Sequence, residues 1–98
     1  MEQGTLIVIE AIAVHDGEGM ARYVAGIAEQ MAARGARTLA KGFDVLEGEP
    51  QGISRTVLHW PSVEAYRAWQ ESDEYRAFHA LRLKSAQLNI IAVPLLAG

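Results

Sequence analysis

His59 is the side chain in this sequence best suited to acid–base chemistry. It stands between Leu58 and Trp60, in a stretch whose composition is typical of a strand. Imidazole groups titrate near neutral pH, so a histidine beside a cavity can act as a general base. The alternative is a partly buried histidine whose hydrogen bonds are satisfied by the fold.

Arg82 is the side chain best suited to holding an anion. It completes a helical stripe with the spacing i, i+3, i+4, i+7, which consists of Tyr75, Phe78, His79 and Arg82. A guanidinium on such a stripe can bind a carboxylate or an enolate oxygen through paired hydrogen bonds. The alternatives are a surface arginine or a structural ion pair with one of three carboxylates: Glu10, Glu64 or Glu74.

His79 and Glu10 extend the candidate set without making a metal site. His79 precedes Arg82 by three positions, so the two share a helix face. His79 and His59 would offer a metal two imidazoles, but no carboxylate is placed to complete a closed site. Glu10 interrupts an apolar stretch, and a buried carboxylate there needs a partner, Arg82 or His59, unless solvent reaches it. We therefore predict no metal and no cofactor.

Aromatic side chains would form the walls of a substrate pocket. They recur at helical spacing, which is also typical of residues that pack in a core, so both roles stay open. We predict His59 and Arg82 as the catalytic pair. Substrate contacts are predicted for five residues: Tyr23, Trp69, Tyr75, His79 and Glu10.

The first half of the chain is expected to fold as strand, helix and strand. Residues 5–14 are rich in β-branched residues and apolar at both side-chain parities, as in a strand buried on both faces. Asp16 suits the N-cap of a helix over 17–33, which Gly35 ends as a left-handed C-cap. A more polar stretch, 36–45, follows as an edge strand.

The second half repeats this order. A turn-rich loop leads to a strand over 53–60. Ser62 caps a helix over about 63–87, and a Ser-Asp-Glu break at 72–74 divides it, because the serine can cap a second segment. Residues 88–96 form the last strand, again apolar on both faces.

The order β-α-β-β-α-β predicts an α+β, ferredoxin-like fold, with one domain over residues 1–98. Right-handed crossovers place two helices on one face of a four-stranded antiparallel sheet, with the first and third strands central. The other sheet face then has no cover within one chain, although the strands supply apolar residues to both faces. We therefore predict a homodimer that forms through the sheet face.

Composition narrows the classes of function. Hydrophobic residues make up 50% of the 98, an excess that also favours association. The net charge of −3, without a cluster of Lys and Arg, argues against a nucleic-acid or membrane partner. Cysteine is absent, which excludes disulfides and thiolate sites. Residues 1–4 carry no basic leader, and no apolar run is long enough to span a bilayer, so we expect a cytoplasmic protein.

An ordered set of residues runs through nearly the whole chain: Tyr23, Gly35, Leu46-Glu47-Gly48, His59-Trp60-Pro61-Ser62, Ala65, Trp69, Ser72, Glu74, Tyr75 and Arg82. This set resembles the family called domain of unknown function 1330, within the dimeric α/β-barrel superfamily. The chain departs from the family twice. His59 stands where the family usually has an acidic residue, and Gly35-Ala36 replaces the usual Gly-Gly. The resemblance implies a fold and a dimer, but no agreed reaction.

Three functions remain open. The superfamily includes cofactor-independent monooxygenases and isomerases, so the resemblance implies an enzyme that oxygenates, or removes a proton from, a small acidic or polyketide-like molecule. His59 would be its base, Arg82 its anion holder, and Trp69 and Tyr23 its walls. The second function is a non-catalytic small-ligand-binding or stress-related module that uses the same pocket. The third is a structural dimer without a pocket.

Overall fold

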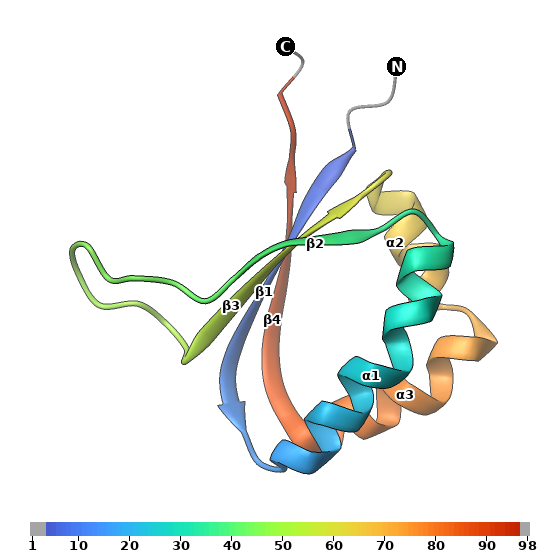
Figure 1. The fold of residues 1–98 in the computed structure, drawn as a ribbon, viewed down its shortest axis with the longest axis horizontal. Helices are drawn as coiled ribbons and strands as arrows, with labels where there is room; N and C mark the ends of the chain where they lie inside the picture. The colour runs from blue at the N-terminus through green and yellow to red at the C-terminus, as the bar shows by residue number, and fades with distance from the viewer. Residues whose placement is uncertain (1–3, 97–98) are drawn as a thin grey trace.

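The computed structural model describes residues 4–96 (Figure 1). Its elements are β1 (Thr5–Val14), α1 (Gly17–Ala33), β2 (Arg37–Lys41), β3 (Ser54–Trp60), α2 (Val63–Gln70), α3 (Asp73–Ser85) and β4 (Ala86–Pro94). The expectation about a leader rests on residues 1–4, of which 1–3 lie outside the described range. Within residues 4–96, no helix is both long and apolar enough to cross a membrane.

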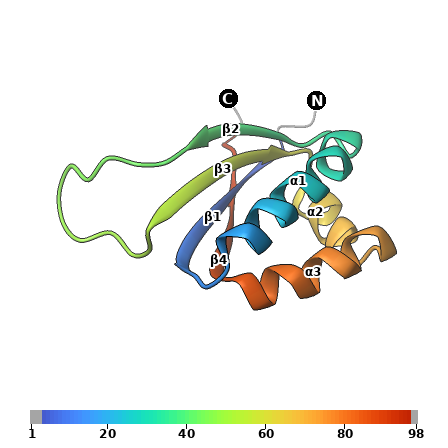
Figure 2. The ribbon, with the colours of Figure 1, turned by 60° about the horizontal axis from the view of Figure 1, so that its bottom comes forward.

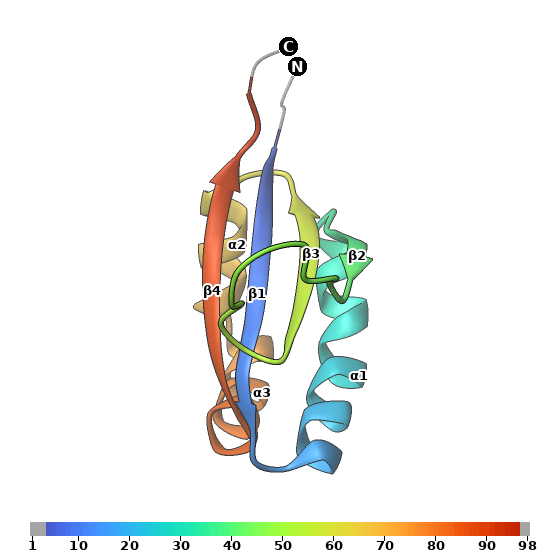
Figure 3. The same cartoon turned by 90° about the vertical axis from the view of Figure 1, so that its left-hand side faces the viewer.

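The strands form one antiparallel sheet in the order β2-β3-β1-β4, which confirms the ferredoxin-like arrangement with β1 and β3 in the centre. The three helices lie on one face of this sheet (Figure 2). Figure 3 shows the strands side by side, with α2 and α3 behind β4 and β1 and with α1 toward the side of β2. The expected second helix is therefore present as two helices, α2 and α3, on the expected face.

Local capping explains where two of the helices begin. Asp16 accepts a hydrogen bond from the backbone N–H of Gly19 at 3.0 Å, so it is the N-cap of α1, as predicted. Ser62 does the same for α2 through the N–H of Ala65, also at 3.0 Å. Gly35 has a φ of 86°, the left-handed conformation expected just past the end of α1.

The end of the long helical region differs from its prediction. Ser72 precedes α3, but its hydroxyl donates to the carbonyl of Trp69 and does not cap α3 with its side chain. Helix α3 ends at Ser85, two residues earlier than expected, because the Ser85 carbonyl accepts hydrogen bonds from the N–H groups of His15 (2.7 Å) and Asp16 (3.1 Å). These bonds turn the chain directly into β4.

The second strand is also shorter than predicted. It ends at Lys41, because Gly42 has a φ of 86° and its N–H bonds the carbonyl of Arg55. Residues 42–53 then form an arm that projects away from the helices (Figures 1 and 2). The arm exposes apolar side chains, including Val45 (54% exposed) and Leu46 (94% exposed).

Strand alternation divides the sheet into an inner face, toward the helices, and an outer face. Leu58 and Trp60 are buried on the inner face, together with Ile7 of β1. His59 lies between them in sequence and therefore projects from the outer face, where it pairs in register with Leu6. The apolar residues of β1 are thus divided between both faces of the sheet, as predicted.

Two features require glycine at position 52: its left-handed backbone and its close approach to Ala11. They predict how substitutions at this position change stability. Gly52 and Gly42 both have a φ of 86°, but a Cβ at position 52 would lie 2.6 Å from the carbonyl oxygen of Ala11, whereas one at position 42 would meet nothing within 4 Å. Gly42→Ala should lower the free energy of unfolding by about 1–2 kcal/mol through the left-handed backbone alone. Gly52→Ala should lower it by at least about 1 kcal/mol more.

Urea denaturation of the two variants measures this difference, because position 42 serves as the matched control. Equal destabilisation by the two substitutions would contradict the contact with Ala11.

Candidate functional site

A polar cavity of about 350 Å³ lies between helices α2 and α3 and the inner face of strands β1 and β4. Its floor is apolar and comes from the sheet, whereas its polar groups come from the helices. The lining residues are Ile7, Val63, Tyr66, Arg67, Gln70, Arg82, Leu88, Ile90 and Ala92. The cavity therefore contains one of the two residues predicted to do chemistry, Arg82.

The guanidinium of Arg82 is available to a ligand. Of the carboxylates considered as structural partners, Glu74 pairs with Arg34 at 2.9 Å and Glu10 pairs with Arg55 at 2.8 Å. Within residues 4–96, Arg82 forms neither an ion pair nor a side-chain hydrogen bond. Its side chain is half-buried, so its charge is only partly screened by water.

Tyr66 and Gln70 complete the polar wall of this cavity. Gln70 donates a hydrogen bond from Nε2 to the Tyr66 hydroxyl oxygen at 2.8 Å, which leaves the phenolic proton available to a ligand. Burial raises the pKa of Tyr66 to about 12, so this phenol stays protonated at neutral pH. The sequence prediction missed both residues, although their i, i+4 spacing places them on one helix face.

A second, apolar cavity of about 300 Å³ lies beneath α1. Tyr23 and Trp69, both predicted as pocket walls, line it, and both are also buried members of the core. Trp69 donates its indole N–H to Gln30 at 2.9 Å, which fixes the indole against α1. The two aromatic residues thus pack in the core and border a cavity, and their contact with a substrate stays a prediction.

Tyr75 and His79 lie beside the cavities and line neither of them. The Tyr75 and Tyr23 hydroxyls share a buried hydrogen bond of 2.8 Å. Burial, reinforced by this bond, raises the pKa of Tyr23 above its ordinary value. The His79 ring stacks on Tyr75 at a centroid distance of 5.6 Å. Both residues thus support the walls without reaching the cavity space.

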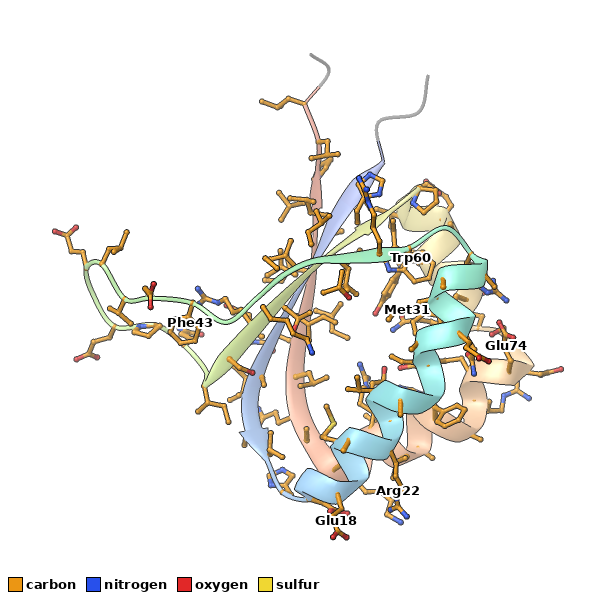
Figure 4. The ribbon with its side chains drawn as sticks, viewed as in Figure 1. Glu18, Arg22, Met31, Phe43, Trp60 and Glu74 are labelled. Atoms are coloured by element: carbon orange, nitrogen blue, oxygen red, sulfur yellow. The ribbon has the colours of Figure 1, made fainter. Side chains whose placement is uncertain are left out.

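His59 and Glu10 project from the opposite face of the sheet, so the structure separates them from Arg82. Glu10 faces Arg55 across the β1–β3 pair, and Arg55 donates to its carboxylate from both Nε and Nη2. Arg55 also lies 5.4 Å above the ring of Phe43, which extends from the arm away from the helices (Figure 4). The partner of Glu10 is therefore Arg55, and neither Arg82 nor His59.

The polar cavity has the chemistry of an anion site. Arg82 and Arg67 contribute two cations and Tyr66 contributes a neutral donor, and no carboxylate or imidazole of the described range 4–96 lines the cavity. Among residues 4–96, no group of three or more His, Asp or Glu side chains is placed to hold a metal ion. The apolar floor excludes water from one side of the half-buried Arg82, which strengthens its attraction for a bound anion.

Comparison with known families and proteins agrees with the architecture. The model of the family described as domain of unknown function (DUF1330) matches residues 5–96. None of the curated proteins matches the chain.

Solved structures share the fold at low sequence identity. A protein of unknown function from Rhodopseudomonas palustris is 16% identical, with a TM-score of 0.77 over 98% of this chain and 85% of that one. A dimeric ferredoxin-like protein of unknown function from Thermobifida fusca is 17% identical, with a TM-score of 0.61 over 97% and 95%. A dimeric ferredoxin-like protein of unknown function from Bacteroides fragilis is 12% identical, with a TM-score of 0.52 over 97% and 100%.

The raised pKa of Tyr66 predicts how stability depends on alkaline pH. Between pH 10 and 12 the folded protein keeps this phenolic proton, whereas the unfolded chain releases it. The free energy of unfolding should therefore fall as the pH rises through this window, by about 1.4 kcal/mol per pH unit for this one group.

Tyr66→Phe retains the ring and removes the ionisation, so its stability should fall less steeply over the same window. Guanidinium denaturation at a series of pH values measures both slopes. Identical slopes for the two proteins would show that Tyr66 has an ordinary pKa.

Proposed function

We propose that this chain, which belongs to the family described as domain of unknown function (DUF1330), is a homodimer that binds a small carboxylate. The outer sheet face supports the dimer, and the geometry of the polar cavity supports the ligand. The observation that carries the proposal is the guanidinium of Arg82, which over residues 4–96 has no ion-pair partner and lies in a cavity that no carboxylate of these residues lines. Desolvating an arginine without a partner costs free energy. An anionic ligand that pairs with the Arg82 guanidinium would recover part of that free energy.

Binding is better supported than proton abstraction. A general base must lie within hydrogen-bond reach of the proton that it removes. Tyr66 is neutral at physiological pH, and its partner Gln70 does not titrate. His59, the predicted base, lies across the thickness of the sheet from Arg82. We therefore assign Arg82 to anion binding and His59 to the outer sheet face, away from this site.

Arg82→Gln tests the anion site. The substitution keeps a polar side chain, although a shorter one, and removes the charge, and charged hydrogen bonds contribute about 1.5–3 kcal/mol. Affinity for a small carboxylate such as butyrate should fall roughly 10- to 100-fold. Titration calorimetry of wild type and variant measures the change.

Arg76→Gln is the matched control on the same helix. Arg76 is 74% exposed and pairs with Asp73, and it lines neither cavity. Its loss should leave affinity unchanged. Equal losses for the two variants would indicate a general effect of net charge and would remove Arg82 from the site.

The outer sheet face supports the proposed homodimer. It carries Leu6 and Val8 of β1 and Val57 of β3, with Ile91 (47% exposed) and Val93 (44% exposed) of β4. Two of the charges within it, Glu10 and Arg55, already neutralise each other and so oppose burial less than separate charges would. Apolar surface of this kind marks an association site, and two of the structural neighbours are described as dimeric.

Ile91→Glu should convert the protein to a monomer at concentrations on the order of micromolar, because two carboxylates would be buried at a self-complementary interface. Sedimentation velocity measures the oligomeric state. Leu83→Glu is the control: Leu83 is 61% exposed on α3, away from the sheet, and its substitution should leave the dimer intact. A dimer that survives Ile91→Glu would place the interface elsewhere.

A further inference from the structure

The polar cavity and the apolar cavity adjoin each other along the inner face of the sheet. Both are lined by Tyr66, Leu88 and Ile90, so the same three side chains form a boundary that each cavity touches from its own side. Tyr66 belongs to the helix layer, whereas Leu88 and Ile90 belong to β4 in the sheet. The two cavities therefore meet at one place between the helix layer and β4.

The two cavities differ in chemistry, although Lys41 and the hydroxyls of Thr38, Ser54 and Thr56 also line the apolar one. The polar cavity carries Arg82 and Arg67. The apolar cavity is lined chiefly by aliphatic and thioether side chains, among them Ile9, Met20, Val24, Ile27 and Met31. Methionine adapts its shape readily to a flexible apolar ligand.

We propose that the two cavities bind a single amphipathic ligand, a monocarboxylate with a medium-length alkyl chain. Its carboxylate lies at Arg82, and its chain passes Tyr66 into the apolar cavity beneath α1. This proposal rests on the proposed function, since it extends the same anion site. Burying the alkyl chain of the ligand removes its apolar surface from water, and this burial adds affinity to that of the carboxylate.

A series of alkanoates separates binding of the alkyl chain in the apolar cavity from binding of the carboxylate at Arg82. Butyrate, hexanoate, octanoate and decanoate are titrated into the full chain by calorimetry, below their micellar concentrations. Each added methylene that enters the apolar cavity should tighten binding about fourfold. The gain should stop when the chain fills the cavity.

Two variants obstruct the apolar cavity from opposite sides. Thr56 lies on the inner face of β3 and lines this cavity, so the side chain introduced by Thr56→Phe projects into it. Val24→Trp narrows it from α1, at a position that is 47% exposed and therefore tolerant of a larger side chain. Either variant should abolish the dependence on chain length and leave butyrate affinity unchanged.

Ala25→Trp is the control, because Ala25 is exposed next to Val24 on α1 and lines neither cavity. It should retain the full wild-type series. Circular dichroism identifies any variant that does not fold, and the other obstructing variant then provides the test.

The outcomes separate the two proposals. Butyrate binding without any gain from longer chains would overturn the amphipathic ligand and leave the anion site standing. Octanoate binding that resists both obstructing variants would also overturn it, because the chain would then lie elsewhere. Failure of every alkanoate to bind would overturn the proposed function itself.

Discussion

A chain of aromatic contacts holds the helices at a fixed distance from the sheet, and the rest of the structure depends on it. Trp60 of β3 is fully buried, with ring centroids 5.2 Å from Tyr66 and 5.4 Å from Trp69. Trp69 continues to Tyr75 at 4.3 Å, and Tyr75 to Tyr23 at 6.2 Å. These rings link β3, α2, α3 and α1 in one path. Rigid rings of this size keep the helices apart from the sheet. The two cavities occupy the space between helices and sheet on either side of this row of rings.

The sheet then separates two kinds of chemistry. Its inner face bounds both cavities and meets the cation of Arg82, whereas its outer face carries Glu10, Arg55 and His59 among apolar side chains. Strand alternation alone produces this division, because neighbouring residues on a strand point to opposite faces. Residues that look like partners in sequence, such as His59 and Arg82, are therefore kept apart by a layer of backbone.

Much of the fold could be predicted from local signals. Asp16, Gly35 and Ser62 each act within a few residues of their own position, so composition and spacing are enough to locate the helices. The alternation of Leu58, His59 and Trp60 also contained the information that His59 faces away from the core, since both of its neighbours are large and apolar. His59 and Arg82 have complementary chemistry, which favours pairing them, but the parity of His59 places it on the other face of the sheet.

The remaining features depend on long-range register. Arg55 meets Glu10 only because β1 and β3 pair in one specific alignment, and the two residues lie 45 positions apart in the chain. Tyr66 became part of a site because α2 crosses the sheet above Leu88 and Ile90, which come from the last strand. No local pattern specifies such an encounter.

The two faces of the sheet are coupled through shared strands. In β1, Ile7 and Ile9 face the cavities while Leu6 and Val8 face outward, and β4 alternates in the same way through Ile90 and Ile91. In the proposed dimer, packing of the outer side chains restrains the same backbone that carries the cavity floor. Because β4 is an edge strand, a second copy of the chain would restrain it more than the monomer can. Dimerisation would then lower the ordering cost of ligand binding without contributing a residue to the cavity.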